Sequence, residues 1–99
     1  ISNNKKEIKL ATLDGPSQLQ IFNESKLKLI EEGDTNVKEK QYESALKAYL
    51  DAHSICSKIE DYDIDLCYKI GDIAERLRKY FIALNFYKIG YKYDKSKSY

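Results

Sequence analysis

One histidine and two cysteines are the residues whose chemistry first suggests a metal site. His53 and Cys56 lie three residues apart and would share one face of a helix, with Cys67 further along the chain. A structural zinc site uses four ligands at characteristic spacings, and three scattered candidates do not supply them. Since a free cysteine also packs as a small apolar side chain, we interpret Cys67 as a core residue. We therefore expect neither a metal site nor a cofactor.

A short acidic run, which contains Glu60, Asp61, Asp63 and Asp65, is a second candidate for a cation site. The calcium-binding loop of the EF-hand has a central glycine and a final glutamate, and this run does not follow that pattern. We interpret these acids as helix caps and solvated charges. The sequence also lacks a glycine-rich phosphate loop, a Ser-His-Asp set and a Cys-His pair on a recognisable motif. These absences predict that the protein is not an enzyme.

The charge and hydropathy of the chain argue against two classes of partner. The 99 residues include 17 Lys and Arg against 16 Asp and Glu, for a net charge of +1, whereas a nucleic-acid-binding domain carries a clear basic excess. The apolar runs are too short for a membrane span. Two cysteines are too few for a disulfide framework, so we expect a reduced, cytoplasmic protein. Because the sequence starts at Ile1 rather than Met, we expect a fragment of a longer protein.

Two stretches of the chain, 33–52 and 71–90, repeat one pattern of residues. Gly33 and Gly71 lie 38 residues apart, and the small and aromatic residues that follow them keep the same offset. A fixed period of this kind indicates a helical repeat. The paired positions are Gly33 and Gly71, Asp34 and Asp72, Tyr42 and Tyr80, Ala45 and Ala83, Leu46 and Leu84, Tyr49 and Tyr87, and Ala52 and Gly90.

Apolar residues at three- and four-residue steps predict four helices that would carry these pairs. A turn at Asp14-Gly15-Pro16 precedes the first helix, and one acid of the run 60–65 would cap the third. We expect one domain over residues 16–93, with a flexible or loosely docked arm at 1–15 and a polar tail at 94–99. The expected helices run from Pro16 or Ser17 to about Lys38 or Lys40, from Gln41 or Tyr42 to about Ile59, from the acidic run to about Lys79, and from Tyr80 to about Tyr93.

The two repeated glycines fall inside otherwise favourable helices, where each costs about 1 kcal/mol relative to alanine. Their recurrence at the same place predicts that the following helix packs closely across Gly33 and across Gly71. Small residues on that following helix, Ala45 and Ala83, would allow the same close approach.

The paired residues resemble the tetratricopeptide repeat, in which two antiparallel helices cross at small residues and carry aromatic residues at fixed places. The usual period is about 34 residues, so the chain is similar to the longer repeats of kinesin light chains, spindle-orientation adaptors and bacterial peptide-sensing regulators. The resemblance implies an all-α fold, a right-handed superhelical stack of antiparallel helix hairpins with four main helices. The residues that carry it are Leu29, Gly33, Tyr42, Ala45, Tyr49 and Ala52 in the first copy and Cys67, Gly71, Tyr80, Ala83, Tyr87 and Gly90 in the second.

The family binds peptides in a groove lined by the leading helix of each hairpin. By position, the resemblance implies a groove that is apolar at one end and acidic in the middle, which favours a basic or amphipathic segment of a partner protein. The same residues could instead be ordinary solvated charges of a helix face. The implied groove residues are Leu27, Ile30, Asp34, Val37, Lys38, Asp65, Tyr68, Asp72, Glu75 and Arg76.

The fourth helix has almost no polar side, although a helix that ends a solenoid normally presents a polar outer face. Since about three repeats are normally needed for stability, we expect either a longer array or a homo-oligomer with an isologous contact through this helix. The candidate contact residues are Phe81, Phe86, Ile89, Tyr91 and Tyr93.

Three functions remain open from the sequence. The first is a protein-protein interaction module, a scaffold that binds a peptide or protein segment in the groove. The second is a structural subunit that assembles through the fourth helix. The third is the sensor domain of a peptide-responsive regulator, which the length of the repeat suggests.

Overall fold

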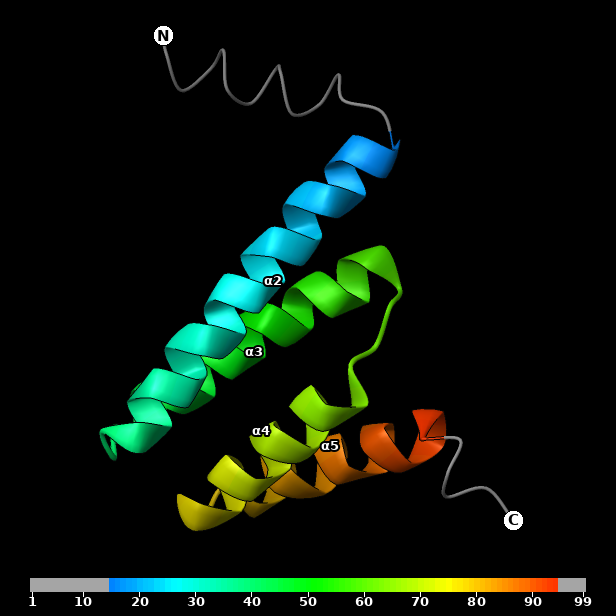
Figure 1. The fold of residues 1–99 in the computed structure, drawn as a ribbon. Helices are drawn as coiled ribbons and strands as arrows, with labels where there is room; N and C mark the ends of the chain where they lie inside the picture. The colour runs from blue at the N-terminus through cyan, green and yellow to red at the C-terminus, as the bar shows by residue number, and fades with distance from the viewer. Residues whose placement is uncertain (1–14, 95–99) are drawn as a thin grey trace, which may run out of the picture.

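A computed structural model describes residues 15–94, which fold into helices and contain no β-strand. In Figure 1, α2 and α3 form one antiparallel hairpin, α4 and α5 form a second, and an irregular segment, 60–63, joins the two. The prediction of an all-helical chain with four main helices paired as hairpins is confirmed. The predicted arm and tail lie outside the described residues except for Gly15 and Asp94. The helices are α2 (Gly15–Lys38), α3 (Tyr42–Ile59), α4 (Ile64–Arg76) and α5 (Tyr80–Tyr93).

The ends of the helices follow from local hydrogen bonding and backbone conformation. Asp63 caps α4, because its carboxylate accepts a hydrogen bond of 3.1 Å from the backbone N–H of Leu66. Glu60 ends α3 in the left-handed conformation, with a φ of 53°. Lys40 and Arg78, which are 38 residues apart, occupy the same conformation with φ values of 61° and 63°. The turn inside each hairpin is therefore repeated together with the helices that it joins.

Each hairpin closes where a tyrosine ring lies against a glycine. The ring of Tyr49 on α3 occupies the space that a Cβ atom on Gly33 would fill, and the ring of Tyr87 on α5 does the same at Gly71. The predicted close packing across both glycines is confirmed. Each tyrosine hydroxyl then donates a hydrogen bond of 2.5 Å to the residue after the glycine, Asp34 in the first hairpin and Asp72 in the second.

The last turn of α5 is held against α4 by a related contact. The ring of Tyr68 lies against Gly90, and its hydroxyl donates a hydrogen bond of 2.9 Å to Asp94. In the 38-residue correspondence Tyr68 stands where the first copy has Ile30, and Gly90 stands where it has Ala52. A larger side chain on the leading helix is thus matched by a smaller one on the trailing helix.

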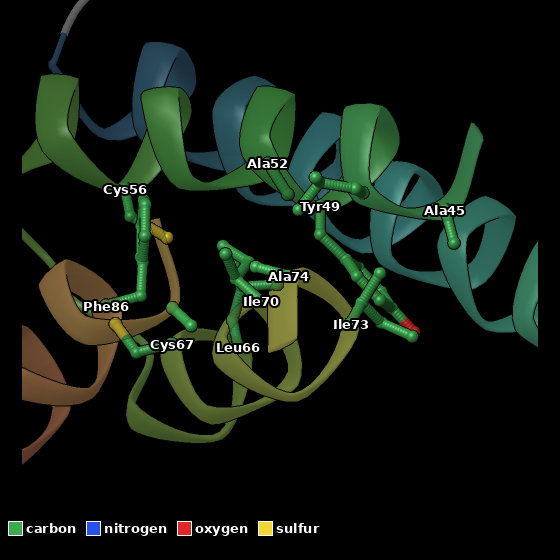
Figure 2. Packing of buried hydrophobic residues seen from close by; sticks show 12 residues of the cluster. Ala45, Tyr49, Ala52, Cys56, Leu66, Cys67, Ile70, Ile73, Ala74 and Phe86 are labelled. Carbon is green, nitrogen blue, oxygen red and sulfur yellow. The ribbon is translucent and has the colours of Figure 1, made fainter. Parts of the chain in front are cut away.

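The core lies mainly between α3 and the second hairpin. Figure 2 shows Cys56, Ala52 and Tyr49 of α3 facing side chains of α4, with Phe86 of α5 reaching the same layer. Both cysteines are fully buried, as expected for Cys67. Burial is the main cause that raises the pKa of the Cys67 thiol to about 11. The buried core residues are Ala45, Leu46, Ala48, Tyr49, Ala52, Cys56, Leu66, Cys67, Ile70, Ile73, Ala74, Ala83 and Phe86.

The structure corrects the predicted contact surface of the fourth helix. Phe86 is only 8% exposed and belongs to the core of the monomer, and Ile89 is half-buried against that core. Phe81 is 93% exposed, whereas Tyr91 and Tyr93 are exposed to a lesser degree. Of the predicted contact residues, Phe81, Tyr91 and Tyr93 therefore lie on the outer surface of α5, and Phe86 does not. None of the helices in the described part of the chain combines the length and the hydrophobicity that crossing a membrane requires.

Candidate functional site

A cleft of about 290 Å³ lies between the two hairpins. Its walls come from the last turns of α2, from the middle of α3 and from α4. Apolar surface and charge meet in it, because aliphatic and aromatic side chains alternate with carboxylates and one ammonium group. The lining residues are Asp34, Val37, Tyr49, Lys69, Asp72 and Ile73.

One carboxylate of the cleft already has two partners. Asp34 accepts a hydrogen bond from the hydroxyl of Tyr49 and an ion pair of 3.0 Å from Nζ of Lys69. Burial alone would raise the pKa of Asp34, but the hydrogen bonds from Tyr49 and Lys69 and the positive charge of Lys69 together lower it. This ion pair joins the first hairpin to the second.

The second carboxylate, Asp72, has no cation partner among the described residues. The hydroxyl of Tyr87 donates to Asp72 at 2.5 Å and also lies 3.1 Å from a carboxylate oxygen of Glu75. The hydrogen bond to Asp72, burial and the negative charges of both acids raise the pKa of Tyr87. The hydroxyl therefore stays protonated and bridges two acids, neither of which forms an ion pair with a lysine or arginine of the described residues. We call these two residues, Asp72 and Glu75, the acidic pair.

The structure brings together three of the ten predicted groove residues, Asp34, Val37 and Asp72. Glu75 joins them through Tyr87, whereas Arg76 lies over the ring of Tyr42, 4.8 Å from its centroid. The remaining five do not line the cleft: Tyr68 packs on Gly90, Ile30 is half-buried against the core, and Leu27, Lys38 and Asp65 are exposed elsewhere on α2 and α4.

Three lining residues were absent from the predicted groove, namely Tyr49, Lys69 and Ile73. Lys69 precedes Asp72 by three residues and Ile73 follows Lys69 by four, so helical spacing would have found Lys69 from Asp72 and then Ile73 from Lys69. The repeat pattern includes Tyr49 as an aromatic residue, and the structure shows that its hydroxyl also holds Asp34.

His53 does not line the cleft. Its ring contacts Phe86 edge-on at 4.8 Å between centroids and lies 6.0 Å from the ring of Tyr62. Its Nδ1 atom is buried without a hydrogen-bond partner among the described residues, and burial lowers its pKa. Within residues 15–94, no group of three or more His, Cys, Asp or Glu side chains is placed to hold a metal ion.

Stability should fall as the pH is lowered through the range in which His53 titrates. The unfolded chain takes up the proton near the ordinary pKa of about 6.5, whereas the folded chain takes it up only at lower pH. The contribution of neutral His53 is therefore complete above the unfolded pKa and is lost as the pH falls below it. Urea titrations at pH 7 and pH 5 should show a smaller decrease for His53→Gln than for the parent. Equal decreases in the two proteins would contradict this.

Comparison with known proteins does not assign the chain to a family. No protein-family model matches it, and neither the curated proteins nor the solved structures contain a match. The function is therefore inferred from the internal repeat and from the geometry of the cleft.

Proposed function

We propose that the protein is an interaction module of the tetratricopeptide type, whose two hairpins stack as a short right-handed superhelix. In this proposal the cleft between α2 and α4 binds a segment of a partner protein. The observation that carries the proposal is the meeting of apolar walls, from Val37 and Ile73, with a carboxylate, Asp72, that has no cation partner among the described residues. The repetition of the glycine, aspartate and tyrosine contacts in both hairpins supports the tetratricopeptide comparison.

The cleft fits a basic side chain better than an acidic or purely apolar one. Its volume of about 290 Å³ is at the lower end of small-molecule sites, so it accommodates one or two side chains of a peptide. A lysine or arginine would lay its aliphatic stem against Val37 and Ile73 and place its charged head at Asp72. The expected ligand is therefore a basic, amphipathic segment.

Selection from a random peptide library displayed on phage tests this proposal. Peptides selected on the protein should be enriched in lysine or arginine beside apolar residues, and calorimetry should show that they bind at least about tenfold more weakly to Asp72→Lys, which corresponds to about 1.4 kcal/mol. The variant Glu31→Lys is the matched control, because it reverses an exposed acid on α2 outside the cleft. Peptides that bind Asp72→Lys and Val37→Ser as well as the parent would overturn the proposal.

A second candidate function is favoured by the exposed surface of α5. Phe81, Tyr80 and Leu84 are 93%, 61% and 53% exposed, and Tyr91 is 58% exposed on the same helix. Large apolar side chains gathered in this way mark a surface that another protein element covers. We propose that α5 is an assembly surface, either in an oligomer or in a longer array.

A further inference from the structure

The outer face of α5 repeats the face of α3 that receives the second hairpin. In the 38-residue correspondence the four aromatic and apolar residues of α3 that meet the second hairpin return on α5 as residues of similar type. On α3 they are buried or half-buried, whereas on α5 three of the four are exposed by more than half. The pairs are Tyr42 and Tyr80, Leu46 and Leu84, Tyr49 and Tyr87, and His53 and Tyr91.

On the first hairpin α4 covers this face at Tyr42 and Tyr49, whereas His53 meets Phe86 of α5 and Tyr62 of the segment 60–63. Ile73 lies in the cleft beside Tyr49, and Lys69 forms its ion pair with Asp34 at 3.0 Å. Arg76 lies 4.8 Å from the centroid of the Tyr42 ring. The covering helix thus brings an apolar stripe, one lysine for the aspartate and one arginine for the tyrosine.

The second hairpin repeats the aspartate and the tyrosine that α4 contacts on the first hairpin, but among residues 15–94 no lysine or arginine is placed on them. Asp72 accepts from Tyr87 as Asp34 accepts from Tyr49, but among the described residues no lysine reaches it. Glu75 adds a second carboxylate at the position where the first hairpin has Val37. Tyr80 is exposed, while its counterpart Tyr42 is covered by an arginine.

We propose that this receiving face, formed by Asp72, Glu75, Tyr80, Leu84 and Tyr91, docks an amphipathic helix with the pattern of α4. The pattern is a lysine with apolar residues three before, one after and four after it, and an arginine seven after it, as in α4 around Lys69. The proposal rests on the second candidate function and names its partner. The lysine pairs with Asp72 and Glu75, the arginine stacks on Tyr80, and the apolar stripe covers Leu84 and Tyr91.

A second copy of the chain, stacked head to tail, does not fit this face. Its α2 would then take the place that α4 takes in the first junction. The α2 residues at the corresponding positions are charged or polar, and all of them are exposed in the structure. Glu31 would face Asp72 where a lysine is needed, which is a repulsive contact. The positions of Leu66, Lys69, Ile70 and Ile73 correspond on α2 to Lys28, Glu31, Glu32 and Thr35.

A peptide that copies residues 61–79 of the chain is a direct probe of this face. Cys67→Ser in the peptide prevents disulfide formation, and Gly71→Ala raises its helicity. In titrations of the whole ¹⁵N-labelled protein, amide shifts should change along α5 at Tyr80, Leu84 and Tyr91. A control peptide with Lys69→Glu and Arg76→Glu should bind at least about tenfold more weakly, since it brings like charges to the acidic pair.

Variants of the protein separate this face from the cleft. Leu84→Ser combined with Tyr91→Ser should weaken binding of the probe at least about tenfold, a loss of about 1.4 kcal/mol. Leu27→Ser, a matched change at an exposed leucine of α2, should leave it unchanged. Val37→Ser should weaken binding of the peptides selected on the cleft but leave binding of the probe unchanged. The cleft proposal and the proposal for the receiving face can therefore fail independently.

Three results would overturn the inference. The first is equal binding of the probe and the charge-reversed peptide. The second is a set of shift changes confined to α2 and α3, which would show that the probe displaces α4 from the first junction. The third is a dimer in sedimentation experiments that dissociates in the Leu84→Ser and Tyr91→Ser variant, since a second copy would then occupy the face.

Discussion

Phe86→Ala should lower the free energy of unfolding by about 3–5 kcal/mol, the usual cost of truncating a buried aromatic side chain. Phe86 is 8% exposed, and its ring meets His53 edge-on at 4.8 Å within the core between the hairpins. For a domain of this size such a loss lowers the melting temperature by more than about 10 °C. Thermal unfolding followed by circular dichroism measures the effect.

Phe81→Ala is the matched control, because it makes the same change on the same helix at a side chain that is 93% exposed. We expect its effect on stability to stay within about 0.5 kcal/mol. Equal melting temperatures for the two variants would contradict the placement of Phe86 in the core. The contrast also determines how assembly is tested, since a charge at position 86 would unfold the monomer before it could separate subunits.

Gly33→Ala should destabilise the protein by about 1–3 kcal/mol, the usual cost of overpacking a core. In an exposed helix, alanine is more stabilising than glycine by about 1 kcal/mol. Helix propensity alone would therefore predict that Gly33→Ala stabilises the protein, and we expect the opposite. The reason is the Tyr49 ring, which fills the space of the new Cβ atom. This ring is 2% exposed and its hydroxyl is bonded to Asp34, so it has no room to move aside.

Gly71→Ala provides the comparison within the same chain. The ring of Tyr87 lies against Gly71, with its nearest atom 2.6 Å from the position of a Cβ atom. Because Tyr87 is half-buried rather than fully buried, its ring can turn toward solvent, and we expect a smaller loss than for Gly33→Ala. Urea unfolding of both variants gives the two values. A stabilised Gly33→Ala variant would contradict the close contact.

The sequence predicted the helices and their hairpins well because their signals are local. Capping by an acid of the run 60–65, which the structure assigns to Asp63, depends on only a few residues in sequence. The close approach at Gly33 and Gly71 was also predictable, since a helix interior rarely keeps two glycines in register without a packing cause. These features depend on residues that lie close together in the sequence or recur at a fixed period.

The functional surfaces were harder to predict because they depend on how one hairpin packs on the other. The ion pair between Lys69 and Asp34 joins residues from different hairpins, and no short-range pattern connects them. The apolar residues of α5 surround much of the helix, so periodicity could not tell the inward Phe86 from the outward Phe81. Only the packed structure shows which of the two faces remains available.

The repeated turns at Lys40 and Arg78 have a consequence for how the chain folds. Each hairpin is made of helices that follow one another in sequence, so its contacts close short loops and cost little entropy. Low contact order of this kind is associated with fast folding. The junction between α3 and α4 must instead align two preformed hairpins, so the kinetic barrier should lie in their docking and the Lys69–Asp34 pair should form late.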